Sequence, residues 1–572
     1  MGRIVGIDLG TTTSEIAYIK NGKPEIIKNG YSSVTPSVVG LDKNLEVLIG
    51  QPAKNQLVLF RERTVLEVKR KMGTSDVVLM AGKKFTPVEI SAIILKELKK
   101  IGKAFLQEEI TGAVITVPAN FNDAQRQATK EAGEKAGLVV ERIINEPTAA
   151  ALAFGIDNMD KEGKILVYDL GGGTFDVTVL EMIEGSLDVM ASRGVNRLGG
   201  KDFDELIVNE IIQKFMNEYN IDLSKDLKAM ARIKDEAEKA KITLSSVNSV
   251  TINFPFIAFK DGEAISFEMD LSRKRYEELI SSYIKQSMDT VQEALDAAKM
   301  SAEEVDIVLA VGGSSRTPLV MQSLREMFGD KIRGGINPDE AVALGAAVQA
   351  GIISNEISGA GSIAIFDVCN HSLGLDIVRE TSRGQEGGFF DRLILRDTHL
   401  PFSRTEIYST LEDYQTSIRL QVYQGEDNLV VNNTKLGELL VPGIPANKAG
   451  EEGIAVTFKY NINGMLEVSA KVLSTDKELS TTINMYAYDA PKSKTEVGIT
   501  EIELEQYTLA GEIKTTVMLY QKNRNNLPEE AKKKADELMK QLKQAVAENN
   551  AEKVEKLDDE LTALIFEYIT LN

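Results

Sequence analysis

Short apolar runs rich in β-branched residues alternate with amphipathic segments along roughly the first 355 residues. The run AVITVPANF is followed by NDAQRQATKEAGEKAGL, and the next run, VERIIN, leads into EPTAAALAFG. This alternation predicts an α/β fold. In the second of these segments, Asn122 or Asp123 can cap a helix at its start, and Gly137 can end it in the left-handed conformation.

The period of the apolar residues changes to two beyond about residue 368. The segment SIRLQVYQGED places Ile418, Leu420 and Val422 on one face, and IAVTFKYNINGMLEVSAKV reads as two alternating strands around Asn463 and Gly464. Asn-Gly between two such strands is a strong hairpin signal. We therefore expect a compact antiparallel β unit over about residues 368–488.

Small and polar residues in SNEISGAGSIAIFDV predict a linker between these regions. Near the C-terminus, Pro528 predicts the start of a helix, and Asn549 with Asn550 predict a break between two helices. The two helices carry one apolar stripe, which core packing explains better than a groove for a partner. The stripe consists of Leu538, Leu542, Val546, Val554, Leu557, Leu561, Leu564 and Tyr568.

The charge and the rare residue types exclude several classes of function. The formal charge of −20, from 66 basic and 86 acidic residues, disfavours nucleic acid or an anionic membrane as a partner. The one cysteine, Cys369, cannot form an internal disulfide, and two histidines are too few for a typical zinc site or histidine-based triad. We find no signal region and no apolar run long enough to span a bilayer, so we expect a cytoplasmic protein.

A turn rich in glycine and threonine occurs twice, each time after a strand that ends in aspartate. GIDLGTTTSE contains Asp8, and ILVYDLGGGTFDVTVLE contains Asp169. Such turns bring backbone N–H groups and hydroxyls close to an anion, so two facing turns would bind a polyphosphate. The aspartates would repel phosphate unless Mg²⁺ lay between them, held mostly through water. A further glycine turn, AVGGSSRTPLV with Arg316, is a plausible platform for a nucleoside, although it also fits an ordinary connection.

Several longer motifs carry a resemblance to a known family. VPANFNDAQRQATKEAGEKAGL, RIINEPTAAALAFG, DLGGGTFDVTVLE, RLGGKDFD, EKAKITLSS, VGGSSRTPLV and NPDEAVALGAAVQ together resemble the heat-shock protein 70 (Hsp70) chaperone family over nearly the whole length. The resemblance extends to DnaK-like members and, among these, to the shorter HscC-type bacterial paralogues. It implies an actin-like, two-lobed α/β ATPase built on ribonuclease H-like repeats (residues 1–355), a linker (356–367), an antiparallel β-sandwich that binds peptides (368–497) and a truncated helical lid (498–572).

The resemblance also implies roles for individual residues of the ATPase. Asp8 and Asp169 would lie around Mg²⁺, and Glu146 with Asp176 would position the attacking water. Lys69 aligns with the catalytic lysine of the family, although its place beside Arg70 and Lys71 also fits a solvated run of charges. Thr174 belongs to the catalytic set as well. The residues implied to bind nucleotide are Gly10, Thr11, Thr12, Thr13, Gly171, Gly172, Gly173, Gly199, Gly200, Glu238, Lys241, Ser245, Gly312, Gly313, Ser314, Arg316 and Asp339.

In the predicted sandwich, the resemblance implies a groove for an extended peptide, with Val378 and Leu411 forming an arch over it. An apolar side chain of the peptide would enter a pocket. For Leu375 and Leu420, a place in the sandwich core is as well supported as a place in the groove. Pro118, Arg126 and Asp367 would relay the nucleotide state. Together with the arch, the residues implied to line the groove are Leu375, Tyr408, Ile418 and Leu420.

The resemblance further implies ATP or ADP, Mg²⁺ and K⁺ as cofactors, and unfolded polypeptides and a J-domain co-chaperone as partners of a monomer. A nucleotide exchange factor is a further expected partner, but the segment between Gly73 and Gly82 is shorter than in the best-known bacterial members, which puts its usual contact in doubt. The insertion ETSRGQEGGFFDR lengthens a loop beside the groove. Two alternatives remain: a small-molecule kinase of the actin superfamily, and an actin-like filament protein. Neither explains the predicted sandwich and lid.

Overall fold

The computed structural model describes most of the chain between residues 2 and 482. The described residues are 2–156, 162–183, 186–333, 337–357, 364–382, 384–475, 477–482, 520, 524, 527–547, 553, 554, 557, 560, 561 and 564. The chain divides into two compact units, Met1–Ala490 and Pro491–Asn572, which are described separately.

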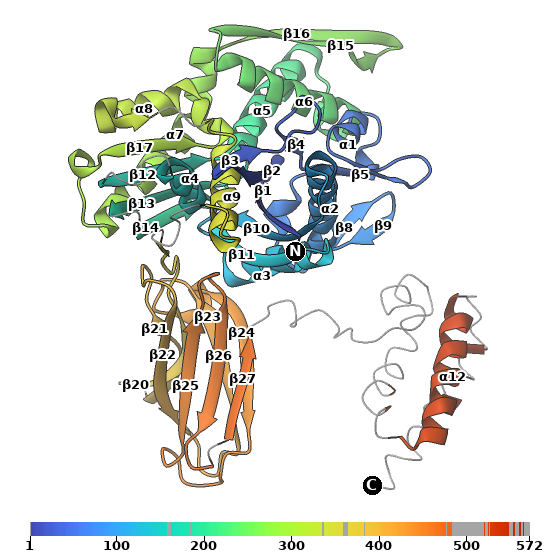
Figure 1. Cartoon of the computed structure of the whole chain (residues 1–572). Helices are drawn as coiled ribbons and strands as arrows, with labels where there is room; N and C mark the ends of the chain where they lie inside the picture. The colour runs from blue at the N-terminus through green and yellow to red at the C-terminus, as the bar shows by residue number, and fades with distance from the viewer. Residues whose placement is uncertain are drawn as a thin grey trace. The chain divides into compact units, whose positions relative to one another are not determined.

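A six-stranded sheet lies at the start of the first unit (Figure 1). Its main order is β11-β10-β1-β2-β3, and β4 pairs with β2. The central strand β1 is parallel to β10 and antiparallel to β2. The strands are β1 (Arg3–Leu9), β2 (Thr13–Lys20), β3 (Lys23–Ile26), β4 (Thr35–Pro36), β10 (Ile110–Val117) and β11 (Val139–Asn145).

A second six-stranded sheet repeats this plan in the order β18-β17-β12-β13-β14-β19. Here β12 is parallel to β17 and antiparallel to β13, as β1 is to β10 and β2. The duplicated strand, turn and strand predicted from the sequence is therefore a duplicated sheet topology. The strands are β12 (Gly163–Leu170), β13 (Phe175–Ile183), β14 (Ser186–Val195), β17 (Ile307–Val311), β18 (Ile332–Arg333) and β19 (Ile365–Phe366).

Two helices, α4 (Glu146–Gly155) and α9 (Ala341–Ile353), join the two sheets. One buried cluster contains Val114 of the first sheet, Val167 of the second, and alanines of both helices. A Cβ added to Gly345 of α9 would lie 1.6 Å from the carbonyl oxygen of Ala149 in α4. The two helices therefore cross with their backbones in contact, which only glycine at this position permits.

The outer helices pack on these sheets and produce two further cores. α2 and α3 contribute to the core of the first sheet, and α5, α6, α7 and α8 contribute to the core of the second. The prediction for α3 is confirmed, because the side chain of Asn122 caps its start and Gly137 follows its end at φ +76°. The helices are α1 (Gln51–Gln56), α2 (Pro87–Leu106), α3 (Asp123–Lys135), α5 (Gly200–Tyr219), α6 (Leu227–Leu244), α7 (Arg273–Ala297) and α8 (Pro318–Phe328).

Smaller sheets complete this region. The three-stranded sheet has the order β6-β5-β7, and two hairpins are formed by β8 with β9 and by β15 with β16. Their strands are β5 (Val39–Leu41), β6 (Val47–Ile49), β7 (Thr64–Val65), β8 (Val78–Met80), β9 (Lys83–Phe85), β15 (Ser249–Lys260) and β16 (Glu263–Ser272).

Beyond β19 the chain forms two four-stranded antiparallel sheets, ordered β21-β20-β23-β24 and β22-β25-β26-β27. One apolar core contains residues from both sheets, which makes a β-sandwich. The hairpin predicted at Asn463 and Gly464 joins β25 to β26. The strands are β20 (Leu373–Thr381), β21 (Gly384–Ile394), β22 (Phe402–Ser409), β23 (Ser417–Gln424), β24 (Thr434–Pro442), β25 (Gly453–Tyr460), β26 (Leu466–Val472) and β27 (Lys477–Thr482).

The predicted linker, residues 356–367, is described on both sides of residues 358–363, which lie outside the described part. Its strand β19 pairs in parallel with β14, with Ile365 opposite Leu187 and Phe366 opposite Asp188. The backbone N–H of Leu187 donates to the carbonyl of Ala364 at 2.8 Å. The linker thus extends the edge of the second sheet.

In the second unit, α12 (Glu529–Ala547) begins directly after Pro528, as predicted. Leu538, Leu542 and Val546 are buried together with the four later leucine and valine positions of the predicted stripe. The break at Asn549 and Asn550, Tyr568, and most of residues 498–572 lie outside the described residues, so the outline of the lid stays a prediction.

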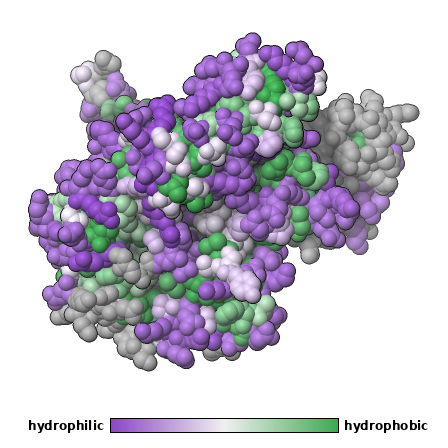
Figure 2. Space-filling view, turned by 90° about the horizontal axis from the view of Figure 1, so that it is seen from above, coloured by the Kyte–Doolittle hydropathy of each residue, from purple (hydrophilic) through white to green (hydrophobic). Residues whose placement is uncertain are grey.

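Hydrophilic residues cover most of the face seen in Figure 2, and apolar residues form scattered patches between them. This surface agrees with a content of 27% charged residues. No helix among the described residues is long and apolar enough to cross a membrane.

Candidate nucleotide site

The two glycine- and threonine-rich turns face one another in the structure. A Cβ added to Gly172 would lie 2.1 Å from Oγ1 of Thr12, and one added to Gly173 would lie 2.9 Å from Cγ2 of Thr11. Side chains larger than glycine would clash at these two positions. Oγ1 of Thr12 is buried and has no hydrogen-bond partner among the described residues. A donor is therefore available where the turns meet.

Each turn carries an aspartate at the end of its first strand. Oδ1 of Asp8 accepts a hydrogen bond from the hydroxyl of Thr116 at 2.7 Å. Asp169 lies opposite Asp176 in the register of β12 and β13, and Oδ1 of Asp176 accepts from the backbone N–H of Asn120 at 3.1 Å. These hydrogen bonds fix the orientation of the Asp8 and Asp176 carboxylates.

Lys69 provides the cation at the centre of the site. It lies in a short 3-10 helix, Val68–Lys71, and its Nζ is 2.5 Å from Oε1 of Glu146 at the start of α4. Only 6% of Lys69 is exposed, so it does not belong to a solvated run of charges. The alternative drawn from its neighbours Arg70 and Lys71 is wrong for this residue.

Burial shifts the ionisation of the whole group. It raises the pKa of Asp8 and Glu146, although Lys69 opposes the change. Burial and the nearby Glu146 raise the pKa of Asp169 well above its usual range and that of Asp176 to about 7. Burial lowers the pKa of Lys69, whereas the carboxylates of Glu146 and Asp8 raise it, and the net shift is upward.

Three buried carboxyl groups and the half-buried Asp8 therefore lie around one ammonium group, and a bound cation would balance this excess of negative charge. Among the described residues, no three acidic, histidine or cysteine side chains are placed to ligate one metal ion directly. Mg²⁺ held mostly through water stays a prediction.

Other predicted nucleotide-binding residues lie against the second turn. The carbonyl of Gly171 accepts from the hydroxyl of Ser314 at 2.9 Å and from the N–H of Gly200 at 3.0 Å. The backbone N–H of Gly171 donates to the carbonyl of Thr174 at 3.1 Å. A Cβ on Gly199 would lie 2.6 Å from the nitrogen of Gly173. The start of α5 therefore packs directly on this turn.

The first turn and the third glycine turn are similarly tight. A Cβ on Gly10 would lie 2.1 Å from the carbonyl oxygen of Thr13. Gly312 has φ +77°, and a Cβ there would lie 2.5 Å from the carbonyl oxygen of Leu170. A Cβ on Gly313 would lie 3.0 Å from Asp339. The third turn thus meets the end of β12, close to Asp169.

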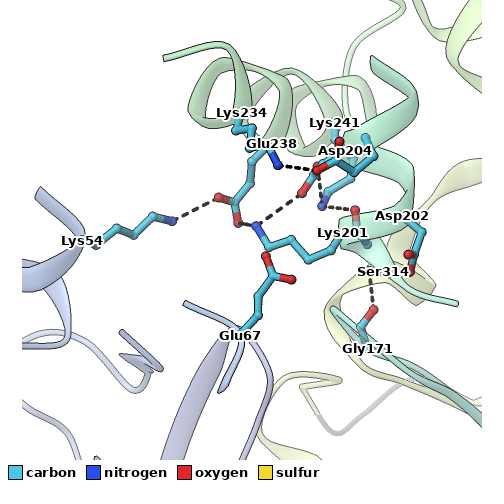
Figure 3. Close-up of polar contacts among 12 residues, drawn as sticks. Lys54, Glu67, Gly171, Lys201, Asp202, Asp204, Lys234, Glu238, Lys241 and Ser314 are labelled. Atoms are coloured by element: carbon cyan, nitrogen blue, oxygen red, sulfur yellow. Dashed lines mark hydrogen bonds and ion pairs between the residues drawn. The ribbon is translucent and has the colours of Figure 1, made fainter. Parts of the chain in front are cut away.

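A chain of ion pairs borders this site (Figure 3). Glu238 of α6 lies 3.2 Å from Lys54 of α1 and 3.4 Å from Lys201 of α5. Burial raises the pKa of Glu238, but Lys201 and Lys54 lower it, and the net shift is downward. Lys241 lies 2.8 Å from Asp204 and donates to the carbonyl of Gly200 at 2.9 Å. Glu238 and Lys241 thus belong to one network of charges, and their contact with the nucleoside stays a prediction.

Three members of this chain, Lys54, Lys201 and Asp204, are absent from the sequence prediction. Lys201 and Asp204 lie within the motif RLGGKDFD, but their partners Glu238 and Lys241 belong to another helix, and no pattern around Lys54 marks it. The predicted pair of Arg316 and Asp339 forms a separate ion pair at 2.7 Å, and the hydroxyl of Ser245 donates within α6 to the carbonyl of Lys241 at 3.4 Å.

The predicted groove residues lie together in the sandwich. Leu375 is 1% exposed and Leu420 is 5% exposed, and both belong to its core, against which Tyr408 and Ile418 pack. The core assignment of Leu375 and Leu420 therefore holds in this structure. Val378 is half-buried, and Leu411 is 44% exposed.

The predicted relay residues connect the sandwich end of the linker to α3. Arg126 donates to Oδ1 of Asn145 at 2.7 Å, and the amide of Asn145 donates to Oδ2 of Asp367 at 2.7 Å. All three are buried, as is Pro118. Pro118 lies at the end of β10 and accepts from the N–H of Phe121 at 3.1 Å.

Further hydrogen bonds join the sandwich to the region that contains the two six-stranded sheets. Oδ1 of Asp123 accepts from the N–H of Leu466 at 2.8 Å, and Oδ1 of Asn463 accepts from the N–H of Ile143 at 3.1 Å. The sandwich hairpin therefore contacts both α3 and β11.

Comparison with known proteins decides the family. The sequence model described as Hsp70 protein matches residues 4–569 of the chain. The chain belongs to the Hsp70 family. Chaperone protein DnaK of Thermotoga neapolitana is 42% identical over 574 residues, which cover 98% of this chain and 95% of that protein. DnaK of Thermosipho africanus is 42% identical over 573 residues, covering 98% and 94%.

Membership in the Hsp70 family makes the chain an ATP-dependent chaperone and an ATPase, which confirms the function expected from its motifs. Proteins of this family bind nucleotide with Mg²⁺ and bind unfolded polypeptides. The mixed α/β architecture with several sheets is consistent with the family fold. The finer resemblance to HscC-type paralogues stays a prediction.

Proposed function

We propose that the site between the two turns hydrolyses ATP, with residues 1–355 as the ATPase domain. The strongest support for this proposal is the close approach of the two turns at Thr12 and Gly172. The buried ion pair of Lys69 and Glu146 adds to it. Backbone N–H groups and hydroxyls of both turns would hold the phosphates. Bound Mg²⁺ would neutralise charge on the phosphate oxygens, with Asp8 and Asp169 holding its water ligands.

The roles of the surrounding side chains follow from their charges. The ammonium of Lys69 would stabilise negative charge that develops on the transferred phosphoryl group, without giving up its proton. Glu146 and Asp176 carry acceptor oxygens that would orient the attacking water. The hydroxyl of Thr174 would donate to a phosphate oxygen from the second turn. Glu238, Lys241 and Ser245, with Arg316 of the third turn, would hold the nucleoside.

We further propose that residues 368–497 bind extended segments of unfolded proteins, and that residues 498–572 cover the bound segment. Pairing of β19 with β14 and the hydrogen bonds from Arg126 through Asn145 to Asp367 would couple nucleotide and peptide binding. The protein would act as a cytoplasmic monomer with a J-domain co-chaperone and a nucleotide exchange factor, and K⁺ would assist phosphate binding.

The effect of a peptide on the rate of ATP hydrolysis tests this function. An extended apolar peptide should raise the steady-state rate, whereas a small-molecule kinase or a filament protein should not respond. Thr174→Ala should retain ATP binding and slow hydrolysis. Thr251→Ala, on the exposed β15 and β16 hairpin, is the matched control. A Thr174→Ala rate equal to that of the parent would contradict the assigned site.

A further inference from the structure

A carboxylate lies among the residues of the proposed peptide groove. Asp391 of β21 is directly opposite Leu375 of β20 in the register of the two strands, so both side chains lie on the inner face of their sheet. Oδ2 of Asp391 accepts a hydrogen bond from the hydroxyl of Tyr408 at 2.8 Å, which reaches across from the other sheet. Two predicted groove residues therefore border Asp391.

The second oxygen of Asp391, Oδ1, has no hydrogen bond and no ion pair within the described part of the chain. The arginine side chains near Asp391 form hydrogen bonds or ion pairs with other residues. Arg392, which follows it, donates to Oδ1 of Asn428 at 3.2 Å, and Arg404 pairs with Glu406 at 2.6 Å. Burial and the bond to Asp391 raise the pKa of Tyr408, so its hydroxyl remains a donor. The carboxylate keeps one oxygen available.

We propose that Asp391 makes the groove select extended peptides that place a lysine or arginine side chain beside Tyr408 and Ile418, which are only partly buried. This inference rests on the proposed peptide binding and specifies its substrate. The aliphatic stem of such a side chain packs on apolar residues, and its charged end reaches a polar group. Here the stem would lie on Ile418 and the ring of Tyr408, and the cation would pair with Oδ1 of Asp391. A norleucine side chain has a similar stem but cannot make this ion pair.

Two labelled peptides that differ at one central position, lysine or norleucine, provide the test on the full chain. We expect Asp391→Asn, which keeps an acceptor for Tyr408, to weaken binding of the lysine peptide about tenfold and the norleucine peptide less than twofold. Fluorescence anisotropy measures both affinities. Asp413→Asn removes a carboxylate that pairs with Lys448 at 2.8 Å and should change neither affinity.

The parent protein supplies a second measurement that needs no variant. Added salt should weaken binding of the lysine peptide and leave the norleucine peptide nearly unchanged. Equal salt dependence of the two peptides, or an equal loss with Asp391→Asn, would overturn the assignment of Asp391. Failure of every peptide to bind and to change ATP hydrolysis would instead contradict the proposed peptide binding itself.

Discussion

Nζ of Lys69 lies 2.5 Å from Oε1 of Glu146, and both side chains are buried. The pair joins the short helix after β7 to the start of α4. Lys69 therefore has a fixed position before nucleotide binds, which is the condition for electrostatic stabilisation without reorganisation.

Replacing Lys69 by alanine should lower the rate of ATP hydrolysis by about a hundredfold or more, because the developing phosphoryl charge loses its cation. ATP affinity should change much less, since both turns remain. Single-turnover hydrolysis and equilibrium nucleotide binding separate the two effects. Lys71→Ala is the matched control, because Lys71 is exposed and pairs only loosely with Asp76 at 3.6 Å. Equal rates for the two variants would refute this role.

His371 should make the contact between the sandwich and the ATPase region sensitive to acid. Burial and the nearby Arg396 lower its pKa to about 4. Arg126 also lowers this pKa, whereas Glu426 raises it. A histidine whose pKa falls on docking stabilises the contact fully above its free pKa of about 6.5, and this stability is lost as the pH falls toward 4.

When the pH falls from 7.5 to 5, His371 should lower the equilibrium constant for docking of the sandwich roughly thirtyfold. His371→Gln should remove this contribution. Protection of the Ile143 and Leu466 amides against hydrogen exchange reports the contact, since both donate across it. Burial raises the pKa of Asp123 to about 7, which has the opposite effect on docking, so the variant must be compared with the parent at each pH. Identical pH profiles would exclude a role for His371.

Arg193 and Asp397 should couple the second sheet to the sandwich. Their two hydrogen bonds, both 2.8 Å, form a bidentate pair. In a double-mutant cycle with alanine, we expect a coupling free energy of about 1–2 kcal/mol, measured from the protection of the Leu466 amide. Arg404 and Glu406, paired within β22, form the control pair and should leave this protection unchanged. Strictly additive losses at Arg193 and Asp397 would exclude a direct coupling.

Gly345→Ala should destabilise the ATPase region by about 2–3 kcal/mol, because the added Cβ would overlap the backbone of Ala149. Thermal unfolding measures the loss. Gly155→Ala is the matched control at the end of α4, where the nearest atom to a new Cβ is Sδ of Met182 at 3.7 Å. That variant should be as stable as the parent or slightly more stable. A normal melting temperature for Gly345→Ala would show that the helices can separate without cost.

Local patterns predicted much of this architecture. The cap at Asn122, the turn at Gly464 and the start of α12 after Pro528 each depend on neighbouring residues, and the structure contains all three. The two glycine turns could also be recognised, because the same pattern of aspartate, glycine and threonine occurs twice, each time after a strand.

Contacts between distant segments could not be derived in this way. Lys54 and Glu238 are 184 residues apart in sequence and form an ion pair, and Lys201 has no local feature that marks it as their neighbour. The burial of Lys69 was hidden by its charged neighbours, since burial depends on the helix and strand packed above it. For Leu375, the alternation of a strand shows that the side chain points inward but not whether a ligand reaches it.

The strand β19 contains two residues, Ile365 and Phe366, and it supplies the outermost pairing of a six-stranded sheet. Each hydrogen bond between backbones contributes about 0.5–1.5 kcal/mol after competition with water is accounted for. Detaching so short a strand therefore requires only a small free energy, within the range that binding one ligand supplies. We therefore expect a single binding event to supply enough free energy to detach or attach this strand.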